Sequence, residues 1–198
     1  MKKIGIFGGR FDPIHNGHLI VAQDLLDKFS LEKIIFLISY NPPHKDVETL
    51  FHHRYKMAKL ATYGNSYFEV SDFERKLNLE KSYTVLVLEA LKKKLPHRDF
   101  YFIMGYDQFL QLSTWYNVEK FLELARPIVL RRGVEDKKFV SSPYSSRVIF
   151  ITQRIIEISS TEIRQRVKEG KSIKYLVPEA VIEYIEKEKL YISHSYIP

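Results

Sequence analysis

Short apolar runs alternate with amphipathic stretches from the N-terminus to about residue 152. The run 33–39 is apolar at nearly every position, as expected for a strand that is buried on both faces of a sheet. Between the runs, apolar residues recur every three or four positions, which indicates helices with one buried face. This pattern predicts strands at 3–7, 33–39, 67–71, 99–104, 127–131 and 147–152, and helices at 16–29, 50–63, 83–95, 106–112 and 118–124.

The alternation of strands and helices predicts an α/β fold, with a parallel sheet and helices on both of its faces. The remaining sequence contains two helical stretches, 160–168 and 178–189, so a small helical C-terminal part is expected at about 155–190. The 198 residues suit a single domain, 1–198. The polar stretch 133–146 is interpreted as a surface loop rather than a linker.

Composition excludes several classes of function without changing this picture. The chain has no cysteine, which excludes disulfides, thiolate metal ligands and cysteine nucleophiles. No apolar run approaches the ~20 residues of a membrane span, and the N-terminus does not have the pattern of a secretory signal, so we expect a soluble cytoplasmic protein. The net charge of +7 favours an anionic partner, which could be a nucleic acid, a membrane surface or a phosphorylated small molecule.

The segment from Gly8 to His18 reads GGRFDPIHNGH and joins the first predicted strand to the first predicted helix. Ligands of open α/β sheets bind at such turns. The glycine pair lets backbone N–H groups approach an anion, and a helix N-terminus favours negative charge. Because neither the dinucleotide fingerprint nor the P-loop is present, His15 and His18 are the candidates for phosphate contact.

Three interpretations of the histidine pair compete. The two rings could simply cap the helix or lie on its surface, or they could bind a metal, which would need a third ligand that the nearby sequence does not supply. Alternatively, their N–H groups could donate to phosphate. The glycine turn, the helix start and the neighbouring Asp12 and Pro13 favour the phosphate interpretation.

The pattern GGxFDPxHxGHL resembles the signature of the HxGH nucleotidyltransferase superfamily, which is related to the class I aminoacyl-tRNA synthetases. The resemblance implies a Rossmann-like, doubly wound parallel sheet and transfer of a nucleotidyl group from a nucleoside triphosphate. Arg10 departs from the pattern, since the family usually carries Thr or Ser there. A guanidinium at this position would either add a phosphate contact or block the approach of the backbone, and the sequence leaves both open.

Later motifs are similar to those of one branch of the superfamily, the bacterial nicotinate mononucleotide adenylyltransferases. Pro42-Pro43-His44-Lys45 is typical of this branch and not of phosphopantetheine adenylyltransferases. Leu86 and Val87 depart from it, because the branch usually has Asp-Thr there. Further matching blocks are Ser82-Tyr83-Thr84, Gly105-Tyr106-Asp107, Trp115, Arg131-Arg132-Gly133, Ile158-Ser159-Ser160-Thr161-Glu162-Ile163-Arg164 and the helix at 177–185.

Each of these motifs also has an ordinary structural explanation. Paired prolines make a rigid turn, and Asp107 could cap a helix. Ser159 and Glu162 have the spacing of a capping box. A lone tryptophan such as Trp115 is more often part of a core than a stacking platform.

The resemblance implies transfer of AMP from ATP to nicotinate mononucleotide, which forms nicotinate adenine dinucleotide and pyrophosphate in NAD biosynthesis. It assigns catalysis to His15, His18 and Arg164. It assigns ATP binding to these three residues together with Gly8, Gly9, Phe11, Gly105, Asp107, Ser159, Ser160 and Thr161, and binding of the acceptor to Lys45, Thr84, Trp115 and Arg131. Mg²⁺ is expected on the ATP phosphates, with no metal ligand from a protein side chain.

Two rival functions remain. The acceptor could instead be nicotinamide mononucleotide or phosphopantetheine, or the chain could bind nucleotides without catalysis. Because the basic residues are spread along the chain, we expect neither a nucleic acid nor a membrane as partner. The sequence does not decide between the two mononucleotides, nor whether the chain forms a homo-oligomer.

Overall fold

The computed structural model describes residues 2–41, 49–131, 142–152 and 156–192. Within them, six strands form one sheet in the order β3-β2-β1-β4-β5-β6, and every neighbouring pair is parallel. The strands are β1 (Lys2–Gly9), β2 (Lys33–Ile38), β3 (Phe68–Ser71), β4 (Arg98–Gly105), β5 (Ala125–Arg131) and β6 (Ile149–Thr152). The predicted doubly wound parallel sheet is therefore confirmed.

The helices also follow the predicted pattern, with one addition. They are α1 (Asn16–Phe29), α2 (Phe51–Ala61), α3 (Phe73–Leu77), α4 (Thr84–Lys94), α5 (Tyr106–Leu110), α6 (Val118–Leu124), α7 (Ser160–Lys168) and α8 (Glu179–Lys187), with short 3₁₀ turns η1 (Leu112–Thr114) and η3 (Ser145–Arg147). Helix α3 was not predicted, because five residues are too few to show a helical period.

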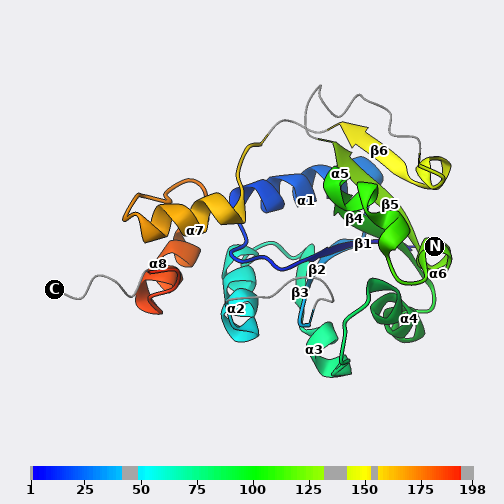
Figure 1. Cartoon of the computed structure of the whole chain (residues 1–198), viewed down its shortest axis with the longest axis horizontal. Coiled ribbons are helices and arrows are strands. Elements are labelled where there is room, and N and C mark those ends of the chain that lie inside the picture. Colours follow the sequence, from blue (N-terminus) through cyan, green and yellow to red (C-terminus); the bar gives the residue numbers. More distant parts are fainter. Residues whose placement is uncertain (1, 42–48, 132–141, 153–155, 193–198) are drawn as a thin grey trace.

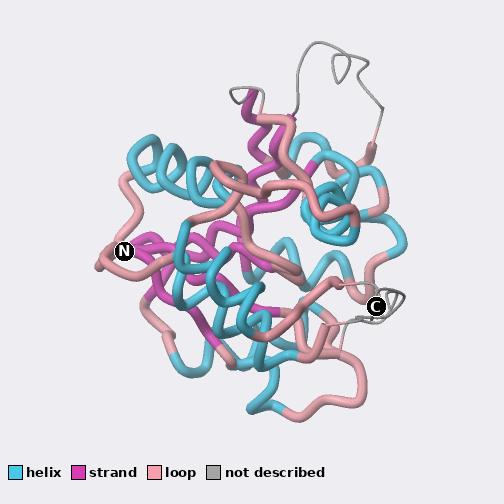
Figure 2. The backbone as a smooth tube through the Cα atoms, turned by 90° about the vertical axis from the view of Figure 1, so that its left-hand side faces the viewer, coloured by secondary structure: helices cyan, strands magenta, loops and turns pink. Residues whose placement is uncertain are grey.

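The sheet separates two hydrophobic cores. Alternate residues of a strand point to opposite faces, so Ile34, Phe36 and Ile38 of β2 join one core, and Ile35 and Leu37 join the other. Figure 2 shows the strands as one twisted layer with helices on both sides. Helices α1, α2, α7 and α8 contribute to the first core, and α4, α5 and α6 to the second.

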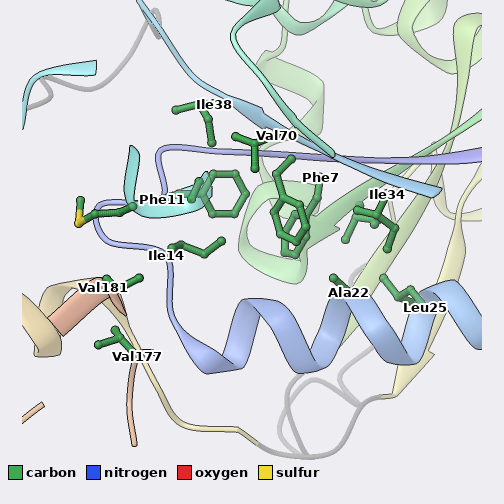
Figure 3. Close-up of a cluster of buried hydrophobic side chains, with 14 of the residues drawn as sticks. Phe7, Phe11, Ile14, Ala22, Leu25, Ile34, Ile38, Val70, Val177 and Val181 are labelled. Atoms are coloured by element: carbon green, nitrogen blue, oxygen red, sulfur yellow. The ribbon is translucent and has the colours of Figure 1, made fainter. Parts of the chain in front are cut away.

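The helical C-terminal part packs on the first core. Val177 and Val181 belong to the same cluster as Ile14 and Phe11, which lie between α1 and the sheet (Figure 3). The backbone N–H of Asn16, at the start of α1, donates to the carbonyl of Leu176 at 2.8 Å. This shared core brings α7 close to the first strand-to-helix turn (Figure 1).

The strand order also determines where loops can form a binding site. β1 and β4 are neighbours, but the chain leaves β1 toward β2 and leaves β4 toward β5. Connections that diverge in this way leave a crevice at the carboxyl ends of the two central strands. Gly8 and Gly9 end β1 and Gly105 ends β4, so these glycines lie at that crevice.

Candidate active site

Two cavities lie side by side at the carboxyl edge of the sheet. The Trp115 cavity, of about 280 Å³, includes Glu74, Ser82, Thr84, Trp115 and Tyr116 in its lining. The histidine cavity, of about 270 Å³, includes Phe11, Asp12, His15, His18, Gly105, Asp107, Ser160, Thr161 and Arg164. Both are lined by Gly8, Gly9, Arg10 and Gln108. The glycine turn therefore forms the junction between two neighbouring sites.

His15 and His18 form a reciprocal cap at the start of α1. The backbone N–H of His15 donates to Nδ1 of His18 at 3.2 Å, and the backbone N–H of His18 donates to Nδ1 of His15 at 3.3 Å. The two rings stack with centroids 3.6 Å apart. Because an Nδ1 that accepts carries no proton, each neutral ring is protonated on Nε2. Both the capping and the phosphate interpretations therefore fit: Nδ1 holds the helix start and Nε2 is a donor.

Phe11 lines the histidine cavity and packs against the ring of His18. It has a positive φ of 51°, and its ring is buried. The ring lies edge-on to His18, with centroids 5.0 Å apart, and edge-on to Phe7, at 5.5 Å. The imidazole of His18 therefore packs against buried aromatic side chains.

The start of α7 is joined to the same turn. Arg164 donates through Nη1 to the carbonyl of Asp12 at 2.8 Å, and Oγ of Ser160 donates to the carbonyl of Pro13 at 2.9 Å. Oγ of Ser159 accepts from the backbone N–H of Glu162 at 3.1 Å and caps the helix. These bonds bring the N-terminus of a nine-residue helix, which favours anions, to the wall of the histidine cavity.

The turn after β4 forms the opposite wall. Asp107 is exposed on the first turn of α5, and the backbone N–H of Gly105 donates to Oε1 of Gln108 at 3.1 Å. A Cβ added to Gly105 would collide with the carboxylate of Asp107. A side chain at position 105 would therefore displace the exposed Asp107 carboxylate from its place against the turn.

The ring of Trp115 packs against the second hydrophobic core, the one to which α4, α5 and α6 contribute. Its ring centroid lies 5.3 Å from that of Phe121 and 6.1 Å from that of Phe102, and the side chain is only half-buried. Thr84, the first residue of α4, lines the same cavity. A partly buried indole that is held by two other aromatic rings is suited to stack on a flat ligand.

Glu74 lies in the lining of the Trp115 cavity, and the sequence did not single it out. The residue is only 6% exposed, and one of its carboxylate oxygens accepts from the backbone N–H of Tyr40 at 3.0 Å. Burial raises the pKa of Glu74 to about 7, although this N–H, the nearby Ser82 hydroxyl and Arg54 act in the opposite direction. The side chain connects the short helix α3 to the backbone that follows β2.

We expect Glu74→Gln to stabilise the fold more at pH 8 than at pH 5. The pKa of Glu74 is about 7 in the folded state, against the ordinary value of 4.5 for a glutamate. The folded state therefore binds the proton more tightly, and the carboxyl group favours folding most below pH 4.5. That contribution is lost as the pH rises through 7, with an upper limit on the order of 3 kcal/mol. Urea unfolding of both proteins at the two pH values measures the difference.

Glu183→Gln is the matched control for this experiment. Glu183 is an exposed glutamate on α8, away from both cavities, so its replacement should change the free energy of unfolding by a similar small amount at both pH values. An equal effect of Glu74→Gln at pH 5 and pH 8 would contradict a buried carboxyl with a raised pKa.

Of the predicted acceptor-binding residues, Arg131 is not part of the lining of either cavity. The guanidinium of Arg131 lies 4.1 Å from the ring centroid of Phe150 and 5.6 Å from that of Tyr106. Lys45 lies outside the described residues, together with Pro42, Pro43, His44, Arg132 and Gly133. Their predicted roles stay predictions.

Residues that line the cavities without having been predicted as site residues include Ser39, Glu74, Gln108 and Tyr116. A usable signal existed for some of them, because Ser39 is the last residue of a predicted strand and Gln108 follows the Gly-Tyr-Asp motif. For Glu74 the signal was weaker: a charged residue just beyond the carboxyl end of β3, within a helix too short to be recognised.

In the part of the chain that the structure describes, no three His, Asp or Glu side chains gather in a way that could hold a metal ion. None of the helices in the described ranges is both long and apolar enough to cross a membrane.

Comparison with known proteins identifies relatives of this chain. Residues 6–166 match the family described as cytidylyltransferase-like. Relatives that carry the name probable nicotinate-nucleotide adenylyltransferase include one from Clostridium tetani, 41% identical over 96% of this chain and 100% of its own length, and one from Desulfitobacterium hafniense, 43% identical over 96% of each chain. A solved structure of Plasmodium falciparum nicotinic acid mononucleotide adenylyltransferase complexed with NaAD is 25% identical, with a TM-score of 0.79 over 96% of this chain and 98% of that one.

Proposed function

The chain is a nucleotidyltransferase of the cytidylyltransferase-like family, and we propose that it transfers AMP from ATP to nicotinate mononucleotide, releasing pyrophosphate and forming nicotinate adenine dinucleotide. One observation carries the proposal: two cavities meet at Gly8, Gly9, Arg10 and Gln108. Transfer between two substrates needs their reacting phosphates side by side, and the junction supplies that place. The names of the relatives and of the solved structure support the choice of acceptor.

ATP would occupy the histidine cavity with its triphosphate across the start of α1. The Nε2–H groups of His15 and His18 would donate to oxygens of the α- and β-phosphates, where negative charge accumulates. Arg164 and the backbone N–H groups of Ser159 to Thr161 would hold the β- and γ-phosphates at the N-terminus of α7. Gly105 and Asp107 form the opposite wall, beside the nucleoside.

The mononucleotide would occupy the Trp115 cavity with its pyridine ring on the indole and Thr84 beside the ring substituent. An oxygen of its phosphate would attack the α-phosphorus of ATP in line, and the bond to pyrophosphate would break with its electron pair on the leaving group. No protein nucleophile is needed, since phosphoryl-type transfer depends on positioning and charge stabilisation. Lys45 and Arg131 remain proposed contacts of the acceptor phosphate on sequence grounds alone.

Mg²⁺ would bind mainly to the triphosphate. The exposed carboxylate of Asp107 lines the histidine cavity, while that of Asp12 accepts from the Tyr191 hydroxyl at 2.6 Å. Phosphate oxygens and waters can complete the coordination of this ion without a side-chain ligand, so a cavity with one exposed carboxylate fits it. When bound, Mg²⁺ would neutralise part of the charge on the departing pyrophosphate.

Pyrophosphate release with a panel of acceptors tests the proposal. The purified protein is incubated with ATP, Mg²⁺ and one of nicotinate mononucleotide, nicotinamide mononucleotide or phosphopantetheine. We expect the highest kcat/KM with nicotinate mononucleotide. A clear preference for another acceptor would support the corresponding rival function. Binding of ATP without turnover on any acceptor would indicate a nucleotide-binding protein without catalysis.

The cellular setting follows from the proposed reaction. A cytoplasmic location is part of the proposal, because ATP is made and used inside cells. The acceptors and ATP are small phosphorylated molecules, which accounts for a basic chain without a nucleic acid or membrane partner. Whether the chain forms a homo-oligomer is a separate question that size-exclusion chromatography with light scattering would answer.

A further inference from the structure

Arg10 lies where the two cavities meet. It follows the glycine pair directly and lines both the Trp115 cavity and the histidine cavity. In the described lining of the Trp115 cavity, Arg10 is the one cationic side chain, and Glu74 is the one anionic side chain. The positive charge that could attract a phosphate into this cavity therefore lies at the junction of the two cavities.

The backbone of Arg10 is held in place by a buried side chain. Nη1 of Arg54 donates to the carbonyl of Arg10 at 3.0 Å and to the carbonyl of Ser39 at 2.8 Å, which ties the turn after β1 to the end of β2. Arg54 is only 1% exposed. The base of the Arg10 side chain therefore has a defined position between the two cavities.

The guanidinium of Arg10 has no protein partner in the described part of the chain. No hydrogen bond or ion pair there involves its side chain, although Glu74 lies in one cavity and Asp12 and Asp107 in the other. The residue is half-buried. Its five N–H donors are thus available to a ligand, and a planar guanidinium can donate to two phosphate oxygens at once.

We propose that Arg10 is a catalytic residue of this chain that binds the acceptor's phosphate and the α-phosphate of ATP together. The proposal rests on the function proposed above. In that reaction, a phosphate oxygen of the acceptor forms a bond to the α-phosphorus while the bond to pyrophosphate breaks. Two anions must approach each other, and a guanidinium between them reduces their repulsion and stabilises the charge that develops in the transition state.

The first experiment compares Arg10→Met and Arg10→Lys with the wild-type enzyme. We expect Arg10→Met to lower kcat/KM for nicotinate mononucleotide by roughly 10²–10³-fold, the cost of losing one charge-stabilising donor. Lysine keeps the positive charge but cannot donate to two phosphate oxygens in the bidentate geometry of a guanidinium, so Arg10→Lys should retain part of the kcat/KM that Arg10→Met loses. Arg126→Met, at an exposed position at the start of β5, is the control and should retain wild-type activity.

The second experiment measures binding without turnover. Calorimetric titration compares nicotinate mononucleotide with nicotinate riboside, which lacks the phosphate. We expect Arg10→Met to weaken binding of the mononucleotide by about tenfold or more, on the scale of one charge-assisted hydrogen bond, and to leave binding of the riboside unchanged. A side chain that only shaped the turn would alter the binding of both ligands equally.

The outcomes separate this inference from the proposed function. If the wild-type protein neither binds nicotinate mononucleotide nor releases pyrophosphate with it, the proposed function fails, and this inference fails with it. If the wild-type protein is active and Arg10→Met has equal or higher activity, the inference alone is overturned, because the guanidinium then contributes nothing or blocks the approach of the backbone. Equal weakening of riboside and mononucleotide binding would also overturn it.

Discussion

Replacing His18 with alanine is expected to lower kcat by roughly 10²–10⁴-fold, the range for one positioned polar group in the transition state. The Nδ1 atom of His18 accepts from the backbone of His15, so its proton is on Nε2, the atom that can donate to a phosphate. Alanine removes that donor where charge accumulates on the α-phosphate during transfer. Steady-state pyrophosphate release with saturating ATP and nicotinate mononucleotide measures the change.

The fold should survive this substitution. The half-buried ring of His18 packs edge-on against Phe11 and Phe7, and its loss removes one capping hydrogen bond, worth about 1 kcal/mol. Circular dichroism and thermal unfolding check that the variant is folded. His52→Ala is the matched control, since His52 is an exposed histidine on α2 that lines neither cavity. Near-wild-type turnover in His18→Ala would exclude the role in catalysis.

The sequence predicted the strands and helices well because apolar runs and helical periods are both local patterns. A strand buried on two faces is apolar throughout, and β2 (Lys33–Ile38) shows this pattern without interruption. Helix α1 has an apolar face and begins at a capping residue, so its bounds of Asn16 to Phe29 agree with the prediction. Helix α3 was missed because its five residues have no period and its position depends on packing against neighbouring elements.

The candidate site was predictable where it depends on a single turn and much less where it depends on distant contacts. The turn from Gly8 to His18 forms a wall of the histidine cavity, as expected from its position after the first strand. The tie between Arg164 and Asp12 spans 152 residues, and that between Tyr191 and Asp12 spans 179. No local sequence pattern indicates which residues so far apart in the chain form a hydrogen bond. The packing of the Arg131 side chain over Phe150 and Tyr106 was likewise not evident from its motif, and its predicted contact with the acceptor stays a prediction.

The second large effect is expected at Arg54, which supports the site without lining it. Its guanidinium is buried and donates to three carbonyls: Nε to Thr49 at 3.0 Å, and Nη1 to Arg10 and Ser39. Burial lowers the pKa of Arg54, while Asp12 and Glu74 are among the groups that favour its charged form. These bonds join the segments that follow β1 and β2 to the segment before α2.

We expect Arg54→Met to reduce the free energy of unfolding by about 3–5 kcal/mol, because it removes three charge-assisted hydrogen bonds and leaves buried carbonyls without donors. Urea unfolding measures this loss. Arg75→Met is the matched control: the guanidinium of Arg75 lies over the same Phe51 ring as that of Arg54, at 5.7 Å against 5.6 Å, but Arg75 is exposed. Its replacement should cost less than about 1 kcal/mol, since surface substitutions rarely cost more. Equal losses in the two variants would show that the stabilisation comes from packing on Phe51 and not from the carbonyls that Arg54 holds.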